Sequence, residues 1–349
     1  MKTSACVIEY RELETRILAA LRADLREEEF AALALAAHAF QKRWNPPYAN
    51  FCATRPPTAH WREIPAVPQS AFKTARLSCF APAQTPVTFR TSGTTGETRG
   101  EHHFLDTRLY DAAVLAGWDR LGMKRIPQTV LAPHPLNTSH SSLAHMFRTL
   151  QQRGFGSALH CISDDGILNG EMALASLEWH ITNGLPVGVF GTALAFLNFF
   201  EMMAERRLTL SAGSYALETG GYKGSGREIP KAELYAMFGE YLGLAPDDVI
   251  NEYGMTELSS QFYTRGLGGV HEGPPWVRTV VIDPETGGEV AVGETGVLRI
   301  FDLANLGSVL AVETQDLAVR RERGFELLGR DPAALPRGCS RAADERMRA

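Results

Sequence analysis

The chain has 349 residues, of which 44% are hydrophobic and 21% are charged, and its formal net charge is -5 at pH 7. This composition is that of a globular protein with a substantial core and excludes a disordered or fibrous chain. The acidic balance argues against a nucleic-acid-binding protein that neutralises many phosphates, although a local basic pocket remains compatible with it.

The N-terminal region, residues 1–60, is expected to be helical. Apolar residues such as Leu13 and Ile17 share one helical face, and a second apolar series begins at Phe30 after a run of glutamates. The run from Asn45 to Tyr48 contains two prolines and is expected to end this helical region.

Residues 61–276 alternate between strand-like and helix-like segments. The expected order is helix 106–121, strand 129–132, helix 141–153, strand 157–162, helix 171–183, strand 186–190, helix 192–206, strand 214–219, helix 230–243 and strand 249–250. This alternation predicts an α/β core with helix-covered sheets. Residues 277–331 carry short strands, at 279–282, 296–300, 309–312 and 325–328, and predict a small β subdomain, which a short tail (332–349) follows.

The apolar stretch from Gly184 to Phe200 is too short for a membrane span, which needs about 20 residues. A proline and glycines interrupt its first half, so we expect a buried strand followed by a helix. The first residues lead into several charged side chains without an uninterrupted apolar core, so no secretory signal is expected, and the five cysteines are widely spaced without a C-x-x-C pair. These features predict a cytoplasmic protein without a membrane span.

Residues 91–100 form a segment suited to binding phosphate. Glycines let the backbone approach an anion, hydroxyl groups donate hydrogen bonds, and an arginine adds positive charge. The residues expected to contact phosphate are Thr91, Ser92, Gly93, Thr94, Thr95, Gly96 and Arg99.

A second segment, Asn251–Glu257, follows the strand at 249–250 and carries the sequence N-E-Y-G-M-T-E. Ligands of open α/β sheets bind at the carboxyl ends of strands. Tyr253 offers an aromatic face, Thr256 a hydroxyl, and Glu257 a carboxylate, which is a ligand that Mg²⁺ prefers.

The first segment resembles the phosphate loop of the adenylate-forming enzymes, and the second resembles their Y-G-x-T-E signature. A closer resemblance is to the acyl-protein synthetase component of the bacterial bioluminescence fatty-acid reductase complex. The segments that carry it are 68–73, 91–100, 141–146, 219–224, 253–258 and 335–340. This resemblance implies ATP-dependent activation of a carboxylic acid, such as a fatty acid, to an acyl-adenylate. It further implies transfer of the acyl group to a protein cysteine.

The resemblance also implies roles for individual residues. The phosphate loop with Arg99 would hold the β- and γ-phosphates of ATP, Thr256 would contact the α-phosphate, and Glu257 would hold Mg²⁺. The adenine slot would be formed by Gly220, Gly221, Tyr222, Asn251 and Tyr253, with Gly254 in the same motif. Asp316, in a variant of the T-G-D motif, would accept hydrogen bonds from the ribose; Gln315 replaces the usual glycine.

Gly329-Arg330-Asp331 resembles the hinge that precedes a mobile C-terminal domain in larger relatives. Only a short tail follows, so that domain and its catalytic lysine are expected to be absent. Lys223 and Arg330 are candidates for neutralising charge as pyrophosphate leaves, and an ordinary surface role is equally open for either.

Cys339 is the candidate acyl acceptor. Arg337 and Arg341 flank it, and nearby positive charge lowers the pKa of a thiol. Two alternatives remain open: a ligase that passes the acyl group to coenzyme A or a carrier protein, and a non-catalytic nucleotide-binding subunit that regulates a reductase complex. His102 and His103 are interpreted as solvated loop residues, with a position facing the acyl or phosphate site as the alternative, and the histidines form no metal set.

Overall fold

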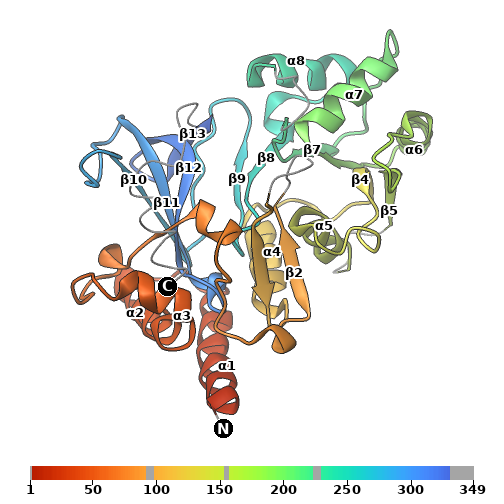
Figure 1. Ribbon diagram of the computed structural model, residues 1–349. Coiled ribbons are helices and arrows are strands. Elements are labelled where there is room, and N and C mark those ends of the chain that lie inside the picture. Colours follow the sequence, from red (N-terminus) through yellow and green to blue (C-terminus); the bar gives the residue numbers. More distant parts are fainter. Residues whose placement is uncertain (1, 92–97, 153–156, 223–228, 331–349) are drawn as a thin grey trace. The chain divides into compact units, whose positions relative to one another are not determined.

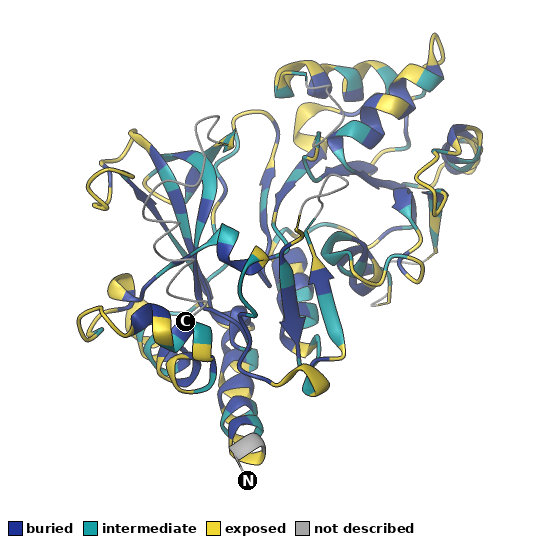
Figure 2. Ribbon diagram, in the orientation of Figure 1, coloured by how far each residue is buried: buried dark blue, intermediate teal, exposed yellow. Residues whose placement is uncertain are grey.

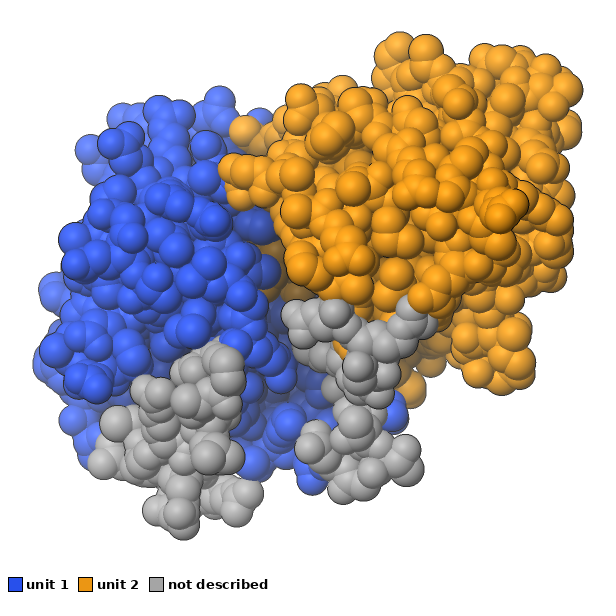
Figure 3. All heavy atoms as spheres, turned by 90° about the horizontal axis from the view of Figure 1, so that it is seen from above, with its two compact units in different colours: residues 1–117, 255–261, 270–349 blue, residues 118–254, 262–269 orange. Residues whose placement is uncertain are grey.

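The computed structural model describes residues 2–91, 98–152, 157–222 and 229–330. The chain divides into two compact units, which Figure 3 colours separately. Unit 1 comprises residues 1–117, 255–261 and 270–349, and unit 2 comprises residues 118–254 and 262–269. Each unit has its own sheet. The chain passes from unit 2 to unit 1 between Gly254 and Met255, inside the Y-G-M-T-E motif.

Unit 2 is built on a six-stranded sheet with the order β5-β4-β6-β7-β8-β9 (Figure 1). Its strands are β4 (Gln128–Pro133), β5 (Ala158–Ile162), β6 (Gly188–Gly191), β7 (Tyr215–Glu218), β8 (Val249–Tyr253) and β9 (Phe262–Arg265). Neighbouring strands are parallel except for β9, which runs antiparallel to β8. Every residue of β6 and β7 is buried. Figure 2 colours the chain by burial.

Helices cover both faces of this sheet. They are α5 (Ser142–Gln152), α6 (Gly170–Thr182), α7 (Ala193–Met203) and α8 (Lys231–Leu242). Val189 belongs to the core formed with α6, α7 and α8, whereas the ring of its neighbour Phe190 lies 5.7 Å from that of Phe147 in α5. Since successive residues of a strand point to opposite faces, α5 covers the face opposite to the other three helices. The predicted α/β alternation is confirmed.

The apolar stretch 184–200 forms β6 and the first part of α7, as predicted. Within the described ranges, no helix combines the length and the apolar character that crossing a membrane requires.

Unit 1 contains a mixed sheet and a separate hairpin. The sheet consists of β1 (Val67–Pro68), β10 (Val277–Ile282), β11 (Thr295–Asp302), β12 (Ala311–Arg320) and β13 (Phe325–Arg330). One edge of β12 pairs with β11, and its other edge pairs first with β1 and then with β13. The hairpin joins β2 (Val87–Arg90) to β3 (Glu101–Phe104).

The N-terminal helices of unit 1 are α1 (Lys2–Ala20), α2 (Glu27–Trp44) and α3 (Pro46–Cys52). The expectation that Asn45 to Tyr48 ends the helical region is wrong, because these residues begin α3. The Asn45 side chain caps this helix by accepting from the Tyr48 N–H. Prolines are tolerated in a first helical turn, where their missing N–H has no helical partner in any case.

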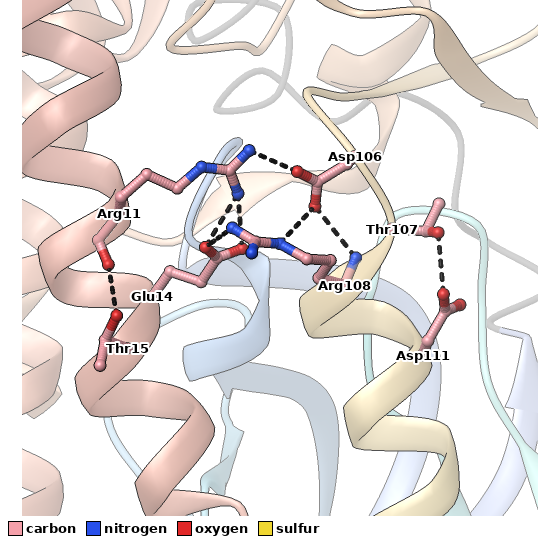
Figure 4. Close-up of polar contacts among 7 residues, drawn as sticks. All are labelled: Arg11, Glu14, Thr15, Asp106, Thr107, Arg108 and Asp111. Carbon is pink, nitrogen blue, oxygen red and sulfur yellow. Dashed lines mark hydrogen bonds and ion pairs between the residues drawn. The ribbon is translucent and has the colours of Figure 1, made fainter.

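A cluster of four charged side chains joins α1 to the turn between β3 and α4 (Arg108–Arg120), as Figure 4 shows. Arg11 Nη1 lies 2.8 Å from Glu14 Oε2, and Arg11 Nη2 lies 2.5 Å from Asp106 Oδ2. Arg108 contacts both carboxylates. The Glu14 side chain is only 2% exposed. The two arginines therefore compensate a buried carboxylate, whose isolation would be costly.

Candidate functional site

The described ends of the phosphate loop are held together at the tip of the β2–β3 hairpin. The Thr91 N–H donates to the Gly100 carbonyl over 3.0 Å, and the Gly100 N–H donates to Thr91 Oγ1 over 2.9 Å. Ser92, Gly93, Thr94, Thr95 and Gly96 lie outside the described residues. Arg99, beside the closed end, is exposed.

His102 links this hairpin to the Y-G-M-T-E motif within unit 1. Its Nδ1 lies 2.8 Å from the backbone oxygen of Thr256. A carbonyl can only accept, so Nδ1 carries the proton and donates. The strand that leaves the phosphate loop therefore fixes the backbone at the threonine expected to contact the α-phosphate.

The interpretation of His102 and His103 as solvated loop residues is wrong, because they lie in β3 and are 2% and 6% exposed. The ring of His102 packs against Phe104, and His103 Nδ1 lies 3.0 Å from Thr88 Oγ1. Burial lowers the pKa of each imidazole to about 4, so both are neutral at pH 7.

Glu257 is a buried carboxylate, only 3% exposed, whose orientation is fixed by neighbours. Gln69 Nε2 donates to Glu257 Oε1 over 3.1 Å, and Asn305 Nδ2 donates to the Glu257 carbonyl over 2.8 Å. One bond orients the carboxylate and the other holds the backbone of the same residue, and a carboxylate held in this way fits a Mg²⁺ ligand. No group of three or more metal-binding side chains occurs among the residues that the structure describes.

Asp302 anchors the chain immediately after Glu257. It is fully buried and accepts hydrogen bonds from the Ser259 N–H over 2.9 Å and from Ser260 Oγ over 2.7 Å. Burial raises the pKa of this carboxyl group, and the hydrogen bonds oppose that effect. Sequence reasoning missed Gln69, Asp302 and Asn305 as supports of the motif.

Asp316 and Arg330 are brought together by strand pairing. They occupy partnered positions of β12 and β13, and Arg330 Nε lies 4.0 Å from Asp316 Oδ1. Gln315 lies in the regular strand β12 and has no positive φ angle, so this position does not require glycine. The Asp316 N–H donates to Thr314 Oγ1, which fixes the local backbone.

In unit 2, the candidate adenine-slot residues gather at the ends of β7 and β8. Gly220 and Gly221 have φ angles of 62° and 94°, which favour glycine, and they follow β7 after Thr219. Asn251 lies on the adjacent strand β8, and its Nδ2 donates to Glu218 Oε2 over 2.7 Å.

The aromatic candidates of unit 2 are both packed. Tyr253 is 8% exposed, and its ring centroid lies 5.9 Å from that of Phe262. Tyr222 is partly buried against the hydrophobic core. Gly254 is exposed, and Lys223 lies outside the described residues.

Four cysteines, Cys6, Cys52, Cys79 and Cys161, are buried and free of disulfides. Burial raises the pKa of each thiol, to about 11 for Cys6 and Cys161. These thiols are therefore poor nucleophiles at neutral pH. Cys339, the candidate acceptor, lies outside the described residues.

No family model matches the chain. Among curated proteins, the chain is 22% identical over 298 residues to a long-chain-fatty-acid–luciferin-component ligase of Aliivibrio fischeri, covering 81% of this chain and 77% of that protein. The ligase of the same description from Vibrio harveyi is 21% identical over 316 residues, with coverages of 85% and 81%.

Solved structures of a 2-hydroxyisobutyryl-CoA ligase share the fold. An open conformation in complex with 2-HIB-AMP and CoA aligns with a TM-score of 0.63 at 14% identity, covering 91% of this chain and 79% of that chain. A postadenylation state of the same ligase aligns with a TM-score of 0.64 at 13% identity, with coverages of 87% and 68%. The resemblance predicted from the motifs is confirmed by the curated relatives, which are described as ligases, and the solved structures show that the fold is shared.

Proposed function

We propose that the chain uses ATP and Mg²⁺ to convert a carboxylic acid, most simply a fatty acid, into an acyl-adenylate, and then transfers the acyl group to a protein cysteine. The phosphate-loop and Y-G-M-T-E motifs support the first half. The curated relatives, described as long-chain-fatty-acid–luciferin-component ligases, support the substrate class. An acyl-accepting reductase is proposed as the partner from the motif resemblance alone.

The observation that carries the first half is the hydrogen bond from His102 Nδ1 to the Thr256 carbonyl, 2.8 Å long. It joins the strand leaving the phosphate loop to the motif that follows β8, although the two residues are 154 positions apart. Two segments identified separately as phosphate-binding are thus connected within unit 1.

The residues of unit 1 suit the chemistry of adenylation. Thr91 to Gly96 with Arg99 would bind the β- and γ-phosphates, and the Thr256 hydroxyl would donate to the α-phosphate as charge develops on it. Glu257 would hold Mg²⁺, which when bound neutralises phosphate charge. Asp316 would accept from the ribose hydroxyls, and Arg330, 4.0 Å from Asp316, would supply positive charge near them.

The residues of unit 2 would bind the base. Gly220 and Gly221 allow the backbone to approach a flat ring closely, and Asn251 offers a polar amide beside them. Tyr222, Tyr253 and Gly254 complete this candidate set, and Lys223 remains a second candidate for charge neutralisation.

The second half of the reaction needs a nucleophilic thiol. The four described cysteines are buried and have raised pKa values, so they are unsuitable. Cys339 stands between Arg337 and Arg341 in sequence, and this positive surrounding favours its thiolate. We therefore propose Cys339 as the acyl acceptor within this chain.

A second candidate function is transfer of the acyl group to coenzyme A or to a carrier protein. The solved structures with the same fold include a ligase described in complex with CoA, which favours this alternative. Product analysis separates the two functions: the purified chain is incubated with ATP, Mg²⁺ and a fatty acid, without acceptor, with coenzyme A, or with a carrier protein. Acylated chain in the absence of any acceptor supports the cysteine route, and acyl-CoA without acylated chain supports the alternative.

A further inference from the structure

Glu218 is a buried carboxylate outside the set of residues proposed to bind the substrates. It is the last residue of β7 and is 3% exposed. Asn251 Nδ2 donates to its Oε2 over 2.7 Å, and the Gly220 N–H donates to its Oε1. One carboxylate thus binds two members of the candidate adenine slot, each through a different oxygen.

The two hydrogen-bond partners of Glu218 are themselves held in place by the backbone. Glu218 and Asn251 occupy paired positions of the parallel strands β7 and β8. Gly220 is held in the left-handed region, and its carbonyl accepts from the N–H of Ala193, the first residue of α7. The turn after β7 is therefore bound both to its own strand and to a neighbouring helix.

The bond to Glu218 decides which way the Asn251 amide faces. Burial raises the pKa of Glu218, and the hydrogen bonds from Asn251 and Gly220 oppose that effect. In the ionised form both of its oxygens accept, so the atom that lies 2.7 Å from Oε2 is the amide nitrogen of Asn251. The carbonyl oxygen Oδ1 then lies on the other side of the amide. A base placed beside this oxygen meets a hydrogen-bond acceptor rather than a donor.

We propose that Glu218 is a positioning residue that sets the base specificity of the nucleotide site, by turning the acceptor Oδ1 of Asn251 toward the base. This inference rests on the proposed function, which places Asn251 and the two glycines at the base. A 6-amino group, as in adenine, donates to such an acceptor. A 6-oxo group, as in hypoxanthine, is itself an acceptor and is repelled.

Glu252, the next residue along β8 from Asn251, provides a matched control. It is also buried, and burial together with the charge of Glu218 raises its pKa to about 8. At pH 7 it is mostly protonated, so an amide in its place preserves both charge and size. Glu252→Gln therefore tests for general effects of altering a buried carboxyl group in this sheet.

The test is direct binding of ATP and of inosine triphosphate, which carries the 6-oxo group, measured by titration calorimetry on the full chain. The native chain is expected to bind ATP more tightly by about tenfold or more, the range of a well-placed buried hydrogen bond. In Glu218→Gln the introduced amide can accept from only one of the two donors. If its oxygen stays with the Gly220 N–H, the Asn251 amide must turn over. The preference for ATP is then expected to disappear or to reverse.

The double variant Glu218→Gln/Asn251→Asp restores an acceptor beside the base. The amide at position 218 donates to one oxygen of the carboxylate at position 251, and the other oxygen of that carboxylate accepts from the base. We expect it to recover the preference for ATP, and Glu252→Gln to retain it. A folded Glu218→Gln with the native preference would overturn the inference. If Glu218→Gln does not fold, the double variant decides, since a folded double variant without the preference for ATP contradicts the proposal.

Binding is measured separately from catalysis, so the two proposals can fail separately. A native chain that prefers ATP but activates no acid refutes the proposed function and leaves the role of Glu218 intact. A native chain that binds ATP and inosine triphosphate equally refutes the role of Glu218 alone. A native chain that binds neither nucleotide refutes both.

Discussion

The neutral imidazole of His102 donates from Nδ1 to the carbonyl oxygen of Thr256 over 2.8 Å. Removing this donor leaves a partly buried carbonyl without its hydrogen bond and frees the backbone of the Y-G-M-T-E motif. We expect His102→Leu to lower the free energy of unfolding, measured with urea, by on the order of 1–3 kcal/mol. We also expect it to slow adenylation by about tenfold.

His103→Leu is the matched control for that prediction. His103 is buried in the same strand and bonds to Thr88 instead of the motif. It should lose stability to a similar extent while keeping the native adenylation rate. Equal rates for the two variants, measured under conditions in which both are folded, would remove His102 from its positioning role.

Glu257→Gln tests the proposed Mg²⁺ ligand. The amide has nearly the same shape but lacks the negative charge that a hard divalent cation requires. We expect adenylation to fall by on the order of a hundredfold or more, and the Mg²⁺ concentration needed for half-maximal activity to rise. Circular dichroism should match the native chain. Native rates at saturating Mg²⁺ in the folded variant would contradict the assignment.

Buried neutral histidines in unit 1 predict sensitivity to acid. Burial lowers the pKa of His38, His102 and His103 from 6.5 to about 4. The unfolded chain therefore takes up protons first as the pH falls. The stability that these residues contribute is present above about pH 6.5 and is lost progressively toward pH 4.

His38→Gln isolates one of these contributions. Its glutamine can still bond to the Tyr48 hydroxyl, which lies 2.9 Å from His38 Nδ1. Between pH 7.5 and pH 5.5 we expect the variant to lose about 1 kcal/mol less stability than the native chain, measured by urea unfolding. Comparing the native chain with the variant removes the contributions that other titrating groups make to both. Glu252 is one such group, and its raised pKa of about 8 changes stability in the opposite direction. If the free energies of unfolding of the native chain and of His38→Gln change equally between the two pH values, this prediction is contradicted.

Cys339→Ser separates the two halves of the proposed reaction. A serine hydroxyl is a much poorer unassisted nucleophile than a partly ionised thiol. We expect acid-dependent pyrophosphate exchange to persist and hydroxylamine-sensitive acyl labelling to disappear. Cys6→Ser is the control, because this buried position should not affect labelling. Full thioester labelling of Cys339→Ser would shift the acceptor to another group, and loss of exchange would indicate that the tail contributes to adenylation.

Much of the fold could be predicted from local sequence pattern. The strands β4, β6 and β7 are continuous, almost fully buried runs, and the segments between them have the length and apolar spacing of helices. Polar residues concealed the length of β12, which continues through Thr314, Gln315 and Asp316. There, cross-strand partners such as Arg299 with Glu313 allow charged side chains to lie in a strand.

The supports of the candidate site could not be predicted in the same way. Asn305 donates to the Glu257 carbonyl, and its own carbonyl accepts from Gln41, which is 264 positions away. Local pattern carries no information about contacts at such separations. The motifs identified the residues expected to touch substrate because their residue types reflect chemistry, whereas Gln69, Glu218 and Asp302 act through tertiary contacts.

The central claim is that this chain adenylates a carboxylic acid, and the most direct test is exchange of labelled pyrophosphate into ATP over a panel of acids. With Mg²⁺ present, we predict that exchange requires an acid and is fastest with one chain-length class of fatty acid. Exchange that stays at the level without acid for every member of the panel, with a chain that still binds ATP, would contradict the account and favour a nucleotide-binding regulatory subunit.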